Sequence, residues 1–515
     1  MSKGRNMRDV ISRRDLAVGL VGLGVTAKTN AKAKEADYFS SACSSSLPEW
    51  VEPLRSKLNK MAFELSGSLK PWNGPSKIFT PEQEGFDSSK NEIATTYIQS
   101  AINRASLAGG GIVRLGRGDY VSGTLDLKSH IRLEVAKGAR LLGSLDLKDY
   151  PDRVAKRPTV MDSNMGMNQS LIFAEGCENI SIAGRGTIDG RGTKVNFPGK
   201  ETVGSTPGRP FVIRVLDCQK VHIQNITMLD SPCWMQNYLN CEDLLIEGIR
   251  VENQSNHNND GIDIDGCRRV IVRDCYVSSG DDALCFKGAS QMPGKDILVE
   301  NCRLYTSCNA VKFGTDSQSL FENVLIRNCE IGGVTEEMRR VKRVGADSGI
   351  SWEVVDGGTA QNLLVTDIRI VRARSPLYLR LADRARVRPE QPRPPIGVLR
   401  RVVFERISGE NNGPRGSHFL GIPEKQIEDV VLFRVNLSSQ PSTKPILNED
   451  QYPENRQGYP DAHNIDKIGD APAHGLWVRH IKGLKMKEVV FNVPEDDKRP
   501  RYMGNIGVDN VCDVP

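Results

Sequence analysis

The chain repeats a short unit from about residue 180 onward: a β-branched strand, a turn rich in Asn, Asp or Gly, and a second short strand. The first apolar residues of the leading strands are Ile180, Val221, Leu244, Val270, Ile297, Val324, Leu363, Val402 and Val430, in steps of 41, 23, 26, 27, 27, 39, 39 and 28 residues. Such a period, with turn residues between short strands, is typical of a solenoid whose rungs bury their inward side chains only by stacking. The repeat predicts an all-β chain wound into a single-stranded parallel β-helix, in which the longer steps are rungs with inserted loops. A leucine-rich horseshoe lacks support because its Leu-rich consensus is absent, and a β-sandwich needs no such regular register.

A helical pattern precedes the repeat. Its apolar residues are Tyr97, Ile98, Ala101, Ile102 and Ala105, and it stops at Gly109-Gly110-Gly111. A helix at this point would cover the open N-terminal end of the solenoid, where a sheet edge is otherwise exposed. We therefore expect an N-terminal capping helix and a β-helix over residues 76–510, with a lead-in or linker at 34–75. Residues 437–475 are rich in Pro, Asn and Asp and predict a long loop.

Residues 1–33 differ from the rest in charge. They carry seven Lys or Arg and two acids, and so account for the whole formal net charge of +5. A balanced remainder implies no basic face, which argues against nucleic acid as a partner. Ser12-Arg13-Arg14-Asp15-Leu16, a short apolar run and an Ala31-Lys32-Ala33 exit predict a twin-arginine export signal, hence a periplasmic or secreted protein, rather than an ordinary basic N-terminus. No later apolar stretch is long enough to span a membrane, and we expect a monomer.

Twelve cysteines in an exported chain would ordinarily indicate disulfides. Here they recur at equivalent positions of the repeat: Cys177, Cys218, Cys241 and Cys267 precede leading strands, and Cys275, Cys302 and Cys329 begin second strands. That recurrence favours a buried ladder of free thiols over bridges. If a bridge forms, Cys302 with Cys308 is the pair to test first.

Two acidic clusters lie slightly less than one rung apart. Asp260, in Asn258-Asn259-Asp260-Gly261, is 21 residues before Asp281, in Gly280-Asp281-Asp282. Residues one rung apart lie on adjacent strands at roughly 4.8 Å, so the clusters should face each other. Crowding should raise the pKa of at least one carboxyl and place an acid beside a base. Hydrolysis of a glycosidic bond needs that pairing, and a water-sized gap of roughly 6.5–9.5 Å between the two carboxyls gives inversion.

Other interpretations of these residues stay open. Asp260, Asp263 and Asp265 could bind calcium or cap strands, and Asp263 and Asp265 alternate with apolar neighbours, so we assign them structural duties. Lys287 and Lys312 are 25 residues apart, about one rung, and either hold an acidic sugar or neutralise the aspartates.

Aromatic and histidine side chains near the acids are ambiguous too. Trp234 and Trp352 suit stacking on sugars or packing in the core. His257 adjoins the first acidic cluster, where a lone turn histidine is more often incidental.

From about Phe79 to Val508, the sequence resembles glycoside hydrolase family 28, the polygalacturonase family. The matching stretches are GGGIVRLGRGDYVSGTLDLKSHIRLEVAKGARLLGS, GRGTIDGRG, SPCWMQNYLNCEDLLIEGI, NNDGID and GDDALCFKG. The resemblance implies a right-handed parallel β-helix and single-displacement, inverting hydrolysis without metal or cofactor. It implies Asp281 as general acid and Asp260 and Asp282 as the residues that hold and activate water. Asn258 would help to position the site.

Two departures bear on the substrate. Asn309 stands where the family's Gly-His-Gly motif has His, and Ser348–Gly358 replaces its Arg-Ile-Lys motif. Arg380 and Arg384 lie in SPLYLRLADR, which resembles bacterial members. The sequence thus predicts Asn258, Asn309, Lys287, Lys312 and Arg380 as substrate-binding residues for a pectin-like or other acidic polysaccharide.

Two other functions remain as alternatives: a β-helix polysaccharide lyase, which needs a strong base and usually calcium, and a non-catalytic carbohydrate-binding β-helix. Paired acids serve protonation and water activation better than proton abstraction, which favours the hydrolase. Inserted loops such as 437–475 lean towards exo action without deciding it.

Overall fold

The computed structural model describes residues 44–514, apart from 91, 160–167, 200–207, 291, 388–390, 443–444, 447–453, 455–469 and 494. The expected export signal at 1–33 lies outside these residues. Among the helices that are described, none combines the length and the apolar character needed to cross a bilayer.

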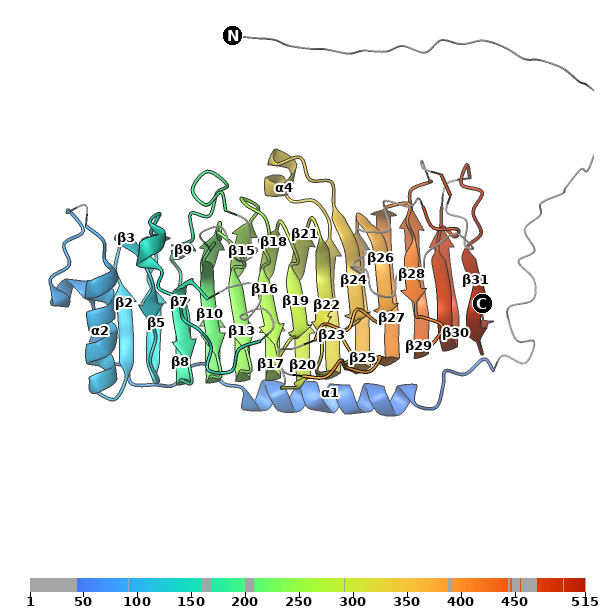
Figure 1. Ribbon diagram of the computed structural model, residues 1–515, viewed down its shortest axis with the longest axis horizontal. Helices are drawn as coiled ribbons and strands as arrows, with labels where there is room; N and C mark the ends of the chain where they lie inside the picture. The colour runs from blue at the N-terminus through green and yellow to red at the C-terminus, as the bar shows by residue number, and fades with distance from the viewer. Residues whose placement is uncertain are drawn as a thin grey trace, which may run out of the picture. The chain divides into compact units, whose positions relative to one another are not determined.

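Parallel strands stack in three columns (Figure 1). The site column contains β4 (Leu125–Asp126), β7 (Ser170–Glu175), β10 (Phe211–Leu216), β13 (Gln236–Leu239), β16 (Ile262–Asp265), β19 (Leu284–Gly288), β22 (Asn309–Ser317), β24 (Ala346–Val354), β26 (Ala373–Leu381) and β28 (Ser417–Leu420). The helix column contains β1 (Ile78–Phe79), β2 (Gly111–Leu115), β5 (Ile131–Val135), β8 (Glu178–Gly184), β11 (Gln219–Gln224), β14 (Glu242–Glu247), β17 (Arg268–Arg273), β20 (Gly294–Glu300), β23 (Leu320–Gly332), β25 (Thr359–Val371), β27 (Val398–Asn412) and β29 (Ile427–Ser439). The third column contains β3 (Gly118–Ser122), β6 (Ala139–Gly143), β9 (Thr187–Asp189), β12 (Thr227–Leu229), β15 (Arg250–Asn253), β18 (Tyr276–Ser279) and β21 (Arg303–Thr306), and it merges into β23. This architecture confirms the predicted right-handed parallel β-helix.

The last rung comes from the C-terminal segment. β30 (Leu476–Asn492) pairs with both β28 and β29, and β31 (Tyr502–Asp509) and β32 (Cys512–Val514) pair with β30. Of the long loop expected at 437–475, residues 437–439 belong to the end of β29 and the rest lies between β29 and β30, much of it outside the described residues.

Each rung turns at residues in the left-handed conformation. Asp243, Asp296, Asn323, Asn362 and Asp429, with φ between 56° and 59°, each immediately precede the first apolar residue of a leading strand. Asn and Asp adopt this conformation more readily than most residues with a Cβ. The Asn and Asp residues between strands are therefore a geometric requirement of the coil as well as a turn signal.

Alternation along the strands separates core from surface. In the site column, Ile262, Leu284, Val311, Ile350 and Leu377 stack in register and are fully buried. Because successive side chains point to opposite faces of a sheet, their neighbours point outward in a second row: Asp263, Cys285, Lys312, Ser351 and Tyr378. The outward row of this column is where the polar site forms.

The N-terminal end is capped as predicted. α2 (Thr95–Leu107) buries Ile98, Ala101, Ile102 and Ala105 in the main core, and Figure 1 shows it against the first rungs. η1 (Pro81–Glu84) and η2 (Leu147–Asp149) are short 3-10 turns, and α4 (Glu336–Arg340) lies in the insertion between β23 and β24.

The lead-in differs from the expectation, because residues 51–68 of the expected linker form an 18-residue helix, α1 (Val51–Ser68). Its buried residues Val51, Leu54, Leu58, Ala62 and Leu65 recur at helical spacing, a signal that was present in the sequence. They pack on an apolar stripe of the helix column made by Leu245, Ile271, Leu298, Leu325, Leu364, Val403 and Val431. In Figure 1 α1 runs beside β17 to β29.

The cysteines form the predicted ladder. Cys218, Cys241 and Cys267 are fully buried, and successive rungs are linked by contacts such as that of the Cys241 amide with Cys267 Sγ at 3.3 Å. Neither Cys302 nor Cys308 is in a disulfide, so the bridge singled out for testing does not form. Cys512, in the last strand, is disulfide-bonded.

Candidate active site

The two acidic clusters meet where β16 and β19 begin. Ile262 is in register with Leu284, and the Gly261 amide donates to the Asp282 carbonyl at 2.8 Å. Asp260 and Asp282 each lie two residues before a member of that register pair, so they lie against each other. The Asp281 amide approaches the Asn259 carbonyl at 3.5 Å. Stacking of rungs thus brings the predicted carboxylates together.

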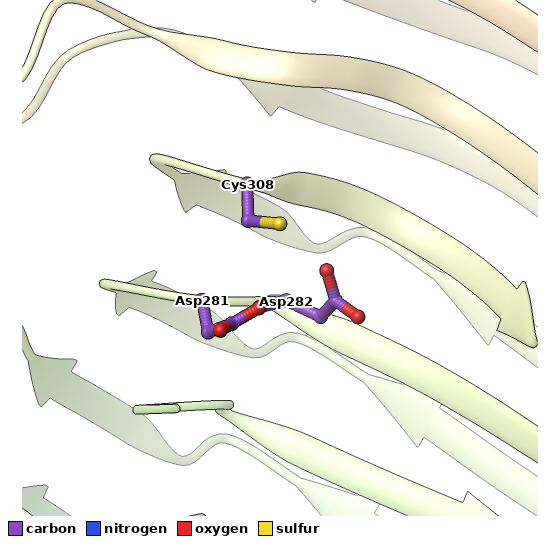
Figure 2. A group of neighbouring side chains, drawn as sticks. All are labelled: Asp281, Asp282 and Cys308. Atoms are coloured by element: carbon purple, nitrogen blue, oxygen red, sulfur yellow. The ribbon is translucent and has the colours of Figure 1, made fainter. Parts of the chain in front are cut away.

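Asp281 differs from its partners in exposure. It is half-buried, whereas Asp260 and Asp282 are each only 3% exposed. Oδ1 of Asp281 accepts the Asp282 amide at 3.0 Å. Figure 2 shows Asp281 and Asp282 side by side, with Cys308 on the next rung; a carboxylate oxygen from each Asp and Cys308 Sγ lie within 4.8 Å of one another.

Nitrogen donors from the following rung surround Asp282. Asn309 Nδ2 donates to Oδ1 at 2.7 Å, the Asn309 amide donates to the same oxygen at 3.2 Å, and Lys312 Nζ lies 3.2 Å from Oδ2. The Ser348 hydroxyl donates to Asn309 Oδ1 at 2.6 Å. That hydroxyl fixes the amide orientation, so that the NH₂ group faces the carboxylate.

Asp260 is a carboxyl whose surroundings favour its protonated form. Burial raises its pKa well above the usual value, the charges of Asp263 and Asp281 raise it further, and Lys287 opposes them. Its Oδ1 is buried without a hydrogen-bond partner among the described residues. The expectation that crowding raises at least one pKa is met here, although burial rather than repulsion is the largest cause.

Lys287 lies beneath the acids and is itself 7% exposed. Its Nζ is 3.3 Å from Asp263 Oδ1 and 4.5 Å from the centre of the Trp234 ring. Burial opposes its charge, but the acidic groups of Cys285, Asp263 and Asp260 raise its pKa well above the usual value. Burial, the largest cause, raises the pKa of Asp263 despite the nearby ammonium.

Both lysines contact aspartates, the arrangement expected if they neutralise the crowded acids. They lie on adjacent rungs but not opposite each other, because the β19–β22 register aligns residues 27 apart and the lysines are 25 apart. Asp265 is the register partner of Lys287, and Cys285 is that of Lys312. Asp265 accepts the Ser290 amide at 2.9 Å, which suits its predicted structural duty.

Asn258 and His257 lie at the edge of the site. Asn258, with φ of 50°, accepts a hydrogen bond from Arg209 Nη2 at 2.9 Å, and Arg209 also donates to the His257 carbonyl at 2.5 Å. The His257 ring is exposed, in keeping with an incidental role.

Three other candidates lie away from the carboxylates. Arg380 is on β26, three rungs beyond β19, and donates from Nη2 to the Glu454 carbonyl at 2.6 Å. Arg384 pairs with Asp356 at 2.5 Å. Trp352 is fully buried in the core beside Phe321, so it packs rather than stacks on a sugar.

Sequence reasoning missed Arg209, Ser348 and Cys308. Each acts through a contact with a residue tens of positions away, and none belongs to an acidic or basic pattern. Ser348 had one usable signal: it lies 39 residues after Asn309, and steps of 39 recur in the repeat.

Asp281, Asp282 and Cys308 are also a described group whose ligand atoms could reach one cation. Calcium takes six to eight oxygen ligands, and two carboxylates with a thiol do not make that set. The geometry therefore offers no support for the calcium-dependent lyase, and the expectation that no metal is needed stays a prediction.

The chain is similar in sequence to known proteins. Residues 118–451, more than half of the chain, match the model of the glycosyl hydrolases family 28. A probable polygalacturonase of Vitis vinifera is 30% identical over 214 residues, covering 39% of this chain and 43% of that protein. The chain spans less than half the length of the first curated relatives that it matches.

Solved structures share the fold. The exopolygalacturonase of Thermotoga maritima superposes with a TM-score of 0.62 at 19% identity, covering 76% of this chain and 93% of that one. The family 28 exopolygalacturonase of Yersinia enterocolitica gives 0.61 at 18% identity, covering 85% and 78%.

Proposed function

The chain belongs to glycosyl hydrolase family 28, and from this premise we propose that it hydrolyses glycosidic bonds of a pectin-like or other acidic polysaccharide with inversion at the anomeric carbon. The observation that carries the proposal is the alignment of Asp260 with Asp282 on adjacent rungs, with Asp281 beside them. Polygalacturonases among the relatives support a galacturonate polymer as substrate.

Asp281 is the proposed general acid. It is the least buried of the three carboxyls, so it can reach the oxygen of the leaving group. Because Oδ1 accepts the Asp282 amide, the proton is assigned to Oδ2. Protonation of the leaving oxygen lowers the charge that develops as the glycosidic bond breaks.

Asp282 and Asp260 are the proposed water-activating pair. Asp282 lies against the Lys312 ammonium and two Asn309 donors, an environment suited to a carboxylate anion that takes a proton from water. Asp260 faces the same space and orients the water; its raised pKa makes its protonation state sensitive to what fills the site.

The remaining predicted residues take supporting roles. Asn309 and Lys312 hold Asp282, Lys287 balances Asp263, and Asn258 with Arg209 shapes the edge of the site. Substrate contact by these residues and by Arg380 stays a prediction.

The segment assignments are part of the same proposal: an export signal at 1–33, a lead-in at 34–75 and a catalytic β-helix at 76–510. They make the protein periplasmic or secreted.

Asp281→Asn tests the assignment. We expect kcat on polygalacturonate to fall by about 10²–10⁴-fold, the usual contribution of general acid catalysis, with unchanged circular dichroism. Asp296→Asn is the matched control, because Asp296 undergoes the same change on the helix column, where Asn also tolerates its left-handed conformation. Near-normal turnover in Asp281→Asn would sink the proposal.

Product analysis separates the alternatives. Hydrolysis releases reducing ends, with inverted anomeric configuration detectable by proton NMR. A lyase would instead yield unsaturated products that absorb in the ultraviolet. Binding without release of reducing sugar would indicate a carbohydrate-binding protein.

A further inference from the structure

A basic cavity of about 340 Å³ lies in the later rungs, a size typical of ligand pockets. Arg372, Arg374 and Arg415 line it, together with Asp470, Gln440 and Asn411. No residue named in the proposed mechanism belongs to its lining. Its position and its basic lining therefore make it a candidate for a second binding site.

The cavity continues the edge on which the catalytic carboxylates lie. Asn309, Ser348 and Ser375 are in register on β22, β24 and β26. The residues directly before them are Cys308, Asp347 and Arg374, and Asp281 has the same place one rung earlier. Arg374 is therefore three rungs beyond Asp281, about 14 Å along the solenoid axis. A polymer lying along this edge passes from the carboxylates to the cavity.

Local contacts join the two ends of that path. The Asp347 amide donates to the Cys308 carbonyl at 2.7 Å. Arg374 Nη1 lies 3.0 Å from Asp347 Oδ1, and Arg415 Nη2 lies 3.9 Å from the same oxygen. Asp347 thus draws both guanidinium groups towards the edge where the polymer would run.

Charge decides the class of ligand. The described lining contains three arginines and one acid, Asp470, and counting Asp347 as well still leaves the arginines in the majority. The Arg415 side chain is 2% exposed and forms the floor, whereas the Arg374 side chain is 42% exposed and can meet a ligand. Guanidinium groups bind carboxylates through paired hydrogen bonds.

We propose that this cavity binds a carboxylate of the polysaccharide three rungs beyond the cleavage point, through Arg372 and Arg374, and so selects unesterified uronate chains. The identity of the polymer rests on the proposed function. The binding step itself does not require catalysis, so it can be tested in an inactive protein.

The experiment uses the full chain carrying Asp281→Asn and measures binding of oligogalacturonates of increasing length by calorimetry. Adding Arg374→Gln should weaken binding of chains long enough to reach the cavity by about tenfold, the loss of roughly one charge-assisted hydrogen bond. Binding of the dimer, and of long chains whose carboxyls are methyl-esterified, should not change. Arg434→Gln is the matched control, since Arg434 is an exposed arginine in a single ion pair on β29. Arg372→Gln provides a second variant should Arg374→Gln fold poorly.

The outcomes are distinguishable. Three results would overturn the cavity assignment. The parent Asp281→Asn and the Arg374→Gln variant could bind long chains equally well, Arg374→Gln could weaken binding of methyl-esterified chains as much as that of unesterified ones, or no oligogalacturonate could bind. Hydrolysis by the native enzyme is scored separately. Length-dependent binding without hydrolysis would overturn the proposed function and leave the cavity assignment standing. Hydrolysis that is unchanged by Arg374→Gln would overturn the cavity assignment and leave the proposed function standing.

Discussion

Asn309 shows how one residue alters the chemistry that the family pattern implies. It stands where the resemblance leads one to expect His, and its amide donates to Asp282 under the control of Ser348. An imidazole changes charge near neutral pH, whereas an amide does not. Asp282 is therefore held by a donor whose charge is constant over the working range, and no histidine titration at this position enters the pH profile.

His418 gives a prediction for stability at the residue scale. Burial, with smaller effects from Arg415 and Arg499, lowers its pKa to about 3. Unfolded histidine has a pKa near 6.5, so between about pH 6.5 and 3 the unfolded state binds a proton that the folded state does not. Stability should thus fall with decreasing pH across that window, by on the order of 5 kcal/mol in total.

The measurement compares wild type with His418→Gln by denaturant unfolding at several pH values. The difference in unfolding free energy between the two should shrink as the pH falls, because only the wild type carries this linkage. A difference that stays constant from neutral pH to pH 3 would contradict the assignment.

At the scale of elements, α1 covers a surface that the repeat alone would expose. Every rung from β14 to β29 places one apolar side chain outward in the helix column, from Leu245 to Val431. A contiguous apolar stripe of this kind needs a partner, and α1 supplies it from a segment remote in sequence. The segment after α1 is anchored too, as the Trp72 amide donates to His222 Nδ1 at 3.1 Å.

Two variants on α1 test this cover. Leu58 is fully buried and Phe63 is 82% exposed on the same helix. Leu58→Ala should lower the free energy needed to detach α1 from the helix column by about 2–5 kcal/mol. Phe63→Ala should change that free energy by no more than about 0.5 kcal/mol. Hydrogen exchange of the α1 amides reports the local opening. Indistinguishable exchange in the two variants would show that α1 is not held by this face.

At the scale of the molecule, stacked thiols report the integrity of the coil. Of the ten cysteines in the described chain that form no disulfide, Cys177 and Cys308 are half-buried and the others are buried. A hydrogen bond with the Cys218 thiol lowers the pKa of Cys177, and thiolates are the reactive form. Cys308 lies beside carboxylates, which disfavour a thiolate.

Native labelling with a thiol reagent, mapped by mass spectrometry, should modify Cys177 first, Cys308 more slowly and the other described thiols only after unfolding. Cys177→Ser should remove the fast phase and leave the rest unchanged. Rapid native labelling of Cys241 or Cys267 would mean that the rungs open far more readily than their burial indicates.

Much of this fold was predictable because a solenoid is built from nearest-neighbour contacts. The strand period and the cysteine ladder depend on residues one rung apart, and inward alternation and the α2 cap depend on spacings of two to four residues. The sequence encodes all of these distances directly. The meeting of Asp260 with Asp281 and Asp282 has the same origin.

The sequence by itself determined that a coil forms and that two acidic turns fall on neighbouring rungs, because stacking repeats a fixed strand geometry. Only the tertiary structure decided what each charged group meets. The β19–β22 register places Lys312 opposite Cys285 rather than Lys287, α1 docks on a stripe hundreds of residues downstream, and loops of unequal length bring Arg372, Arg374 and Arg415 around one cavity. Such contacts depend on the path of loops and bulges through space, which a repeat period does not specify.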